Sequence, residues 1–119
     1  MVSAAAASLH DALEDKMREL EEAVVAFNEE AAGQRPGEGE WCCKEVLSHL
    51  LGDEGEDLVE RFRLIINEDT PLIGIVLGLP YYTPARQAMP VDGLRKGVAS
   101  RYRELAHFLR ALSDEQLAR

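Results

Sequence analysis

The chain has 119 residues, 46% of them hydrophobic, and a formal net charge of −9. This length fits one domain, covering residues 1–119, and the hydrophobic content argues against wholesale disorder. The negative charge, with no basic run in the sequence, argues against non-specific nucleic-acid binding and against anionic membrane surfaces.

The chain shows no targeting or membrane signal. Its start, M-V-S-A-A-A-A-S-L-H, lacks a basic region and an apolar core, and the longest apolar run, 72–79, is far too short to span a bilayer. Cys42 and Cys43 are adjacent, so a bond between them would be strained, and no other cysteine can pair with them. The sequence therefore predicts a reduced, cytoplasmic protein.

The first predicted helix covers residues 3–32. Its apolar residues step by three and four along a seam, while acidic and basic residues occupy the other faces. Ser8 with Asp11 is a candidate capping box, Gly33 is the expected C-cap, and 34–40 has the composition of a turn. His10, near the start, is expected to face solvent.

The second predicted helix covers residues 42–67 and has an apolar stripe that begins at Val46. Cys42 stands where a capping residue belongs and is a weak cap. A thiol at a helix N-terminus can be reactive, but nearby carboxylates oppose its ionisation, so packing is the favoured role. Trp41 is expected to anchor the preceding loop on the bundle.

His49 lies within this stripe, with Glu45 one turn before it and Asp53 one turn after. Either carboxylate could orient the imidazole, because side chains four apart on a helix are neighbours. A histidine facing a bundle core is a usual metal ligand, and Asp53 is a candidate second ligand or supporting group. Taken alone, a single histidine is more simply a partly buried structural residue.

A connection of about two dozen residues follows, which is long for a simple loop. Thr70 and Pro71 predict the start of a short helix over 72–79, apolar on every side and therefore buried. Tyr81, Tyr82 and Arg86 come next, and they either line the mouth of a pocket or, as the favoured role, order this crossover.

The third predicted helix runs from Asp92, as its cap, to about residue 112, with a three-four apolar repeat typical of bundle seams. His107 lies beside this seam and points partly outward, so it is not the expected partner of His49. Ser113 predicts the start of another short helix.

The run W-C-C-K-E-V-L-S-H-L-L-G-D-E, residues 41–54, resembles the signature of the DinB-like family, and Arg61 and Asp69-Thr70-Pro71 match its continuation. The resemblance covers the chain from about Leu9 onward. It implies a bacterial four-helix bundle, often dimeric, in a group that includes damage-inducible proteins and thiol-dependent enzymes. In the metal-binding members, one histidine on the second helix and an H-x-x-x-H pair on the fourth hold a divalent ion.

The resemblance places His49 at the first of these ligand positions. The chain contains no H-x-x-x-H, its other histidines are His10 and His107, and it stops where the family's fourth helix would follow. The metal site implied by the family is therefore incomplete within one chain.

These observations predict an all-α, up-down bundle of three long helices plus a short crossover helix, with dimer packing in place of the fourth helix. The favoured function is a homodimeric binding or interaction module with a degenerate metal site. The alternative is a metal-dependent, thiol-linked transferase or hydrolase-type protein that uses His49, a zinc, nickel or similar ion and a small-molecule thiol.

Overall fold

The computed structural model describes residues 3–52, 57–67 and 81–118. The predicted crossover helix at 72–79 and the candidate Asp53 lie outside these residues. Every regular element within them is a helix, which confirms the all-α class: α1 (Ala4–Val25), α2 (Glu29–Ala32), α3 (Cys43–Leu51), α4 (Leu58–Asn67), α5 (Pro84–Ala88), α6 (Val91–Arg110) and α7 (Asp114–Leu117).

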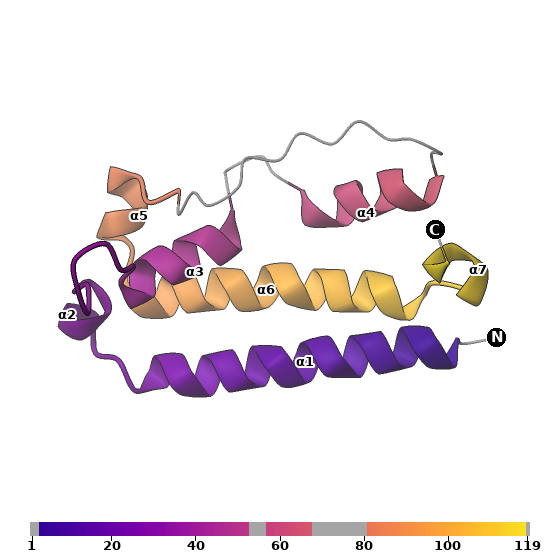
Figure 1. Cartoon of the computed structure of the whole chain (residues 1–119), viewed down its shortest axis with the longest axis horizontal. Helices are drawn as coiled ribbons and strands as arrows, with labels where there is room; N and C mark the ends of the chain where they lie inside the picture. Colours follow the sequence, from indigo (N-terminus) through magenta and orange to yellow (C-terminus); the bar gives the residue numbers. More distant parts are fainter. Residues whose placement is uncertain (1–2, 53–56, 68–80, 119) are drawn as a thin grey trace.

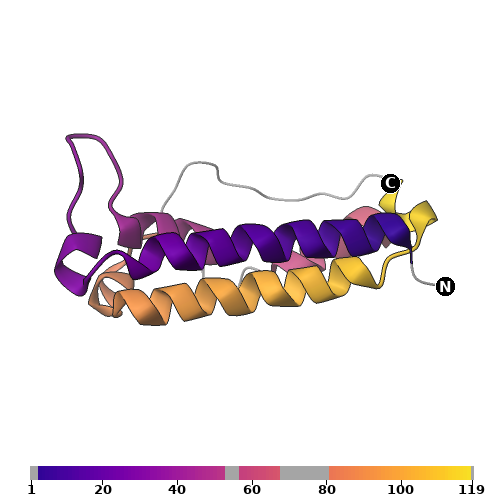
Figure 2. The ribbon, with the colours of Figure 1, turned by 90° about the horizontal axis from the view of Figure 1, so that it is seen from below.

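The helix α6 is the centre of the bundle. It runs antiparallel to α1 along the length of the molecule, and α3 and α4 lie on it one after the other (Figures 1 and 2). The short helices α2 and α7 lie at opposite ends of the α1–α6 pair (Figure 1). None of the helices in the described ranges is both long and apolar enough to cross a membrane.

The hydrophobic core joins α1, α3 and α6. Val24, Leu47, Leu94 and Val98 form its buried part, and half-buried side chains such as Tyr102 pack around them. Each of these residues belongs to an apolar repeat with helical spacing. The periodicity correctly predicted the inward position of these residues, but four others of the same repeats are more than a third exposed: Leu9, Phe27, Val46 and Ile65.

The prediction of one helix over 3–32 was wrong at its C-terminal end. The helix stops after Val25, and a new helix, α2, begins after Asn28. The Asn28 side chain accepts a hydrogen bond from the Ala31 N–H at 2.7 Å, which caps α2 and competes with helical continuation. At the other end Ser3, not Ser8, caps α1, whereas Gly33 caps α2 as predicted.

The prediction of one helix over 42–67 was also wrong, because α3 ends at Gly52. This residue has φ 78° and ψ 179°, a conformation that is open almost only to glycine. The last backbone carbonyls of the helix and of its cap accept hydrogen bonds from arginines. Arg101 donates to the Leu50 and Leu51 oxygens, and Arg86 donates to the Gly52 oxygen at 2.6 Å. The helix therefore ends at a point where two distant side chains take up its terminal acceptors.

The third long helix agrees with its prediction apart from the cap. Pro90 occupies the N-cap position of α6, and Asp92 lies inside the first turn, where it binds Arg95 and Lys96. The expected cap at Asp92 was therefore two residues too late. Ser113 caps the short helix α7 as predicted.

Candidate functional site

Trp41, which precedes α3, and His49, which lies on it, form an aromatic pair. Their ring centroids are 5.2 Å apart and the ring planes are tilted by 57°. Both side chains are half-buried, Trp41 just before the helix and His49 in its last turn. Because Trp41 is the only tryptophan of the chain, its environment reports directly on this pair.

Glu45, one turn before His49, binds an arginine that the sequence analysis did not single out. Arg35 donates to the two carboxylate oxygens of Glu45 at 2.8 and 3.0 Å, and the Cys42 N–H donates to the same carboxylate at 3.3 Å. The Arg35 guanidinium lowers the pKa of Glu45 even though this side chain is only 4% exposed. Glu45 thus ties the 34–41 loop to the start of α3.

The two cysteines at the start of α3 are free thiols. Cys42 is fully buried and Cys43 is half-buried, and burial raises the pKa of the Cys43 thiol. A raised pKa disfavours the thiolate, which is the reactive form. Cys42, the cysteine for which packing was the favoured role, is the more deeply buried of the two.

Arg86 connects the segment before α6 to the end of α3. This buried side chain donates to the Ser48 carbonyl at 3.2 Å and to the Ser48 hydroxyl at 3.0 Å, besides its bond to Gly52. The Ser48 hydroxyl in turn donates to the Tyr81 carbonyl at 3.0 Å. Arg86 thus ties the segment before α6 to the end of α3, while the roles expected of the Tyr81 and Tyr82 side chains stay predictions.

An apolar groove of about 310 Å³ lies between the C-terminal half of α1, the 34–41 loop and α3. Phe27 and Val46 line it and remain 44% and 39% exposed. Trp41 also lines it, so the groove adjoins the Trp41–His49 pair. The other lining residues are Leu20, Ala23, Val24, Gln34, Pro36, Cys43 and Leu47.

A comparison with protein families bears on the whole of this arrangement. The sequence profile of the DinB superfamily matches residues 12–119, which is nearly the entire chain. The chain belongs to the DinB superfamily. Searches of curated proteins and of solved structures gave no match. The DinB membership agrees with the resemblance carried by residues 41–54 and with the packing of α1, α3 and α6 as a bundle.

The described residues around His49, which do not include Asp53, do not by themselves fit the divalent ion that some DinB proteins bind. Within the described ranges, no three His, Cys, Asp or Glu side chains gather closely enough to hold a metal. Glu45 is bound to Arg35, and His107 is an exposed residue in the last turn of α6. A metal at His49 would therefore need ligands from outside these residues or from another chain.

His10 is less exposed than the sequence predicted. Its side chain is 14% exposed and lies between two carboxylates, with Nδ1 3.0 Å from Asp11 and Nε2 3.3 Å from Glu14. Both carboxylates belong to α1, so the pairs are local contacts of one helix. They do not bring His10 to the groove.

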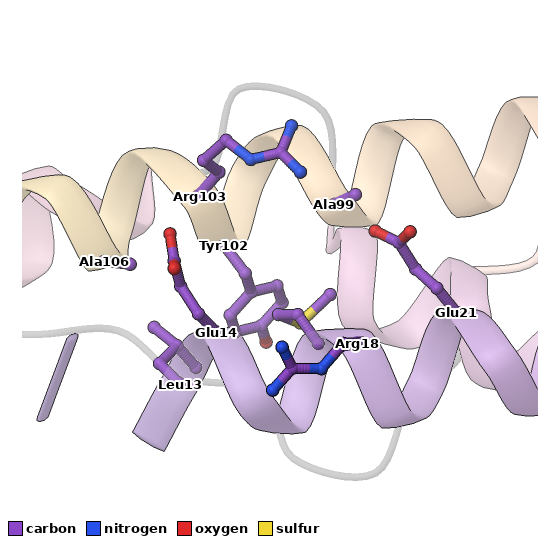
Figure 3. A pocket seen from close by; sticks show the side chains of 9 residues that line it. Leu13, Glu14, Arg18, Glu21, Ala99, Tyr102, Arg103 and Ala106 are labelled. Carbon is purple, nitrogen blue, oxygen red and sulfur yellow. The ribbon is translucent and has the colours of Figure 1, made fainter. Parts of the chain in front are cut away.

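A second hollow of about 250 Å³ lies between α1 and α6 (Figure 3). Tyr102 reaches from α6 toward α1 at its centre, and Glu14 and Glu21 point from α1 toward α6. Leu13, Met17, Arg18, Ala99, Arg103 and Ala106 complete the lining. The sequence analysis missed this hollow, because it depends on how two separate helices face each other.

Proposed function

We propose that this DinB superfamily protein is a homodimeric binding module that covers its apolar groove with a second copy of itself. The observation that carries the proposal is the groove itself, with its exposed Phe27 and Val46. Large apolar side chains gathered around a groove favour association, because their burial contributes about 25 cal/mol per Å².

The packing of the helices supports a two-fold arrangement. Both α1 and α3 pack on α6, and among the described residues no further helix covers their groove-facing sides. In a two-fold dimer each chain presents the same patch, so one contact covers both grooves at once. The reduced thiols Cys42 and Cys43 are consistent with a cytoplasmic protein.

The proposal is tested by sedimentation equilibrium of the wild type and of the variants Phe27→Glu and Val46→Glu. We expect a wild-type dimer and at least about tenfold weaker association for each variant, since a carboxylate in an apolar interface must be desolvated. Val25→Glu is the matched control, because Val25 is 75% exposed and does not line the groove.

Circular dichroism of each variant separates loss of association from loss of folding. A wild type that stays monomeric at all accessible concentrations would contradict the proposal. A control variant that dissociates as strongly as Phe27→Glu would also contradict it, because the contact would then lie elsewhere.

A metalloprotein is the second candidate, and the position of His49 supports it. This half-buried histidine lies on α3 within the sequence run that resembles the DinB-like signature. A second chain could supply further ligands, and the ion would activate a water or a thiol cosubstrate for transfer chemistry.

Elemental analysis separates the two candidates when the wild type is compared with His49→Ala and His107→Ala. Stoichiometric zinc or nickel that is lost only in His49→Ala would favour the metalloprotein. A metal-free dimer that is unchanged by either substitution would favour the binding module.

A further inference from the structure

The hollow between α1 and α6 arises from the sequence of α6. Ala99 and Ala106 flank Tyr102 on the side that faces α1, so small side chains occupy positions where large ones would fill the space between the helices. Both alanines are buried, at 8% and 1% exposure. The floor of the hollow is therefore apolar, with a phenol ring at its centre.

The rim of the hollow carries charges of both signs in equal number. Glu14, Arg18 and Glu21 come from α1, and Arg103 comes from α6 (Figure 3). The two acidic and two basic side chains give the rim no net charge. A ligand with a single charge would meet attraction and repulsion together, whereas a molecule with both charges can match both.

Two polar groups of α6 have unused hydrogen-bonding capacity. Arg103 and Tyr102 both line the hollow, and no hydrogen bond or ion pair joins the Arg103 guanidinium or the Tyr102 hydroxyl to another residue that the structure describes. Three of their neighbours are already engaged: Glu14 with His10, Arg18 with Asp15, and Glu21 with Arg95. The free donors thus lie on α6 and the paired acidic groups on α1.

We propose that this hollow binds a small apolar zwitterion, of the class of the aromatic or branched amino acids. The ligand's carboxylate would bind Arg103 at the rim, and its ammonium group would lie toward Glu14 and Glu21 on α1. Its side chain would pack on Met17 and on the aromatic ring. A volume of about 250 Å³ lies below the range of about 300–1,000 Å³ typical of sites for drug-sized ligands, which restricts the class to small molecules.

This site is separate from the apolar groove, because the two share no lining residue. The proposal therefore does not depend on the dimer or on a metal. It can fail or succeed independently of the proposed function.

The test is a titration of the isotope-labelled full chain, followed by amide chemical shifts, with three related probes. L-Phenylalanine carries both charges, phenylacetate only the negative one, and phenethylamine only the positive one. We expect saturable shifts with L-phenylalanine in the parts of α1 and α6 around the hollow, and at least about tenfold weaker binding of the other two.

Arg103→Gln should weaken L-phenylalanine binding at least about tenfold, and Arg110→Gln is the matched control. Both arginines are exposed residues of α6, and only Arg103 lines the hollow. No saturable shift with L-phenylalanine would overturn the proposal. Equal binding of the three probes, or an equal effect of the two substitutions, would also overturn it.

Discussion

The α1–α6 pair and the junction of α3 with α5 are stabilised by different forces. The long pair buries apolar seams, and some of its ion pairs, such as that between Lys96 and Asp92, lie at the surface. At the junction, Lys44, Glu45, Ser48 and Arg86 are all buried. Burial of apolar area stabilises a fold without requiring particular partners, whereas each buried polar group needs a specific hydrogen-bond or ion-pair partner. The stability of the junction therefore depends more strongly on single residues.

The three buried charges at the junction are neutralised in two ways. Lys44 pairs with Glu29 and Glu45 pairs with Arg35, so each has a charged partner that is more than half exposed. Arg86 instead binds the carbonyls of Ser48 and Gly52 at the C-terminus of α3. Helix C-termini carry a partial negative charge, which stabilises a cation there without a carboxylate.

The largest expected loss of stability comes from a substitution in the core of the long pair. Leu94→Ala removes a fully buried side chain from the core it shares with Val24, Leu47 and Val98, and we expect a loss of about 2–5 kcal/mol in the free energy of unfolding. Chemical denaturation measures this value. Leu9→Ala is the control, because Leu9 is 45% exposed and should cost under about 1 kcal/mol. Equal losses in the two variants would contradict the position of the core.

Arg86→Met tests the junction and should have the next largest effect. The substitution leaves the Gly52 and Ser48 carbonyls without this donor, and we expect a loss of about 1.5–3 kcal/mol, since the lost hydrogen bonds involve a charged group. Hydrogen exchange should show faster opening of α3 than of α6. Arg110→Met, at an exposed site, should change neither quantity. If the amides of α3 kept their protection from hydrogen exchange in Arg86→Met, Arg86 would not stabilise the C-terminal end of α3.

Of the three substitutions, Glu45→Gln should change the free energy of unfolding least. Its effect should be smaller at low pH than at neutral pH. Arg35 lowers the pKa of Glu45 in the folded chain, so the ionised carboxylate stabilises the fold above its unfolded pKa, and this contribution is lost as the pH falls through the folded pKa. The difference in unfolding free energy between wild type and variant should therefore shrink from pH 7 toward pH 3. Glu38→Gln, at an exposed position, should show no such trend. A difference in unfolding free energy that does not change with pH would argue against the Arg35–Glu45 pair.

The sequence by itself determined the all-α class, the inward position of core residues such as Leu94 and Val98, the family and the place of His49 on α3. These features follow from local signals, because apolar periodicity and a short signature are read within a few turns of one helix. The tertiary structure decided where the helices stop. Gly52 ends α3 where Arg86 and Arg101 bind its carbonyls, and neither arginine is near it in sequence.

The tertiary structure also decided the surroundings of the candidate sites. The Arg35–Glu45 pair, the groove beside Trp41 and the hollow at Tyr102 each combine residues from segments that are separated along the chain. Spacing within one helix cannot show which side chain of another segment faces it, because that depends on how the helices rotate and cross when they pack. The sequence could therefore place His49, but only the fold shows which groups lie around it.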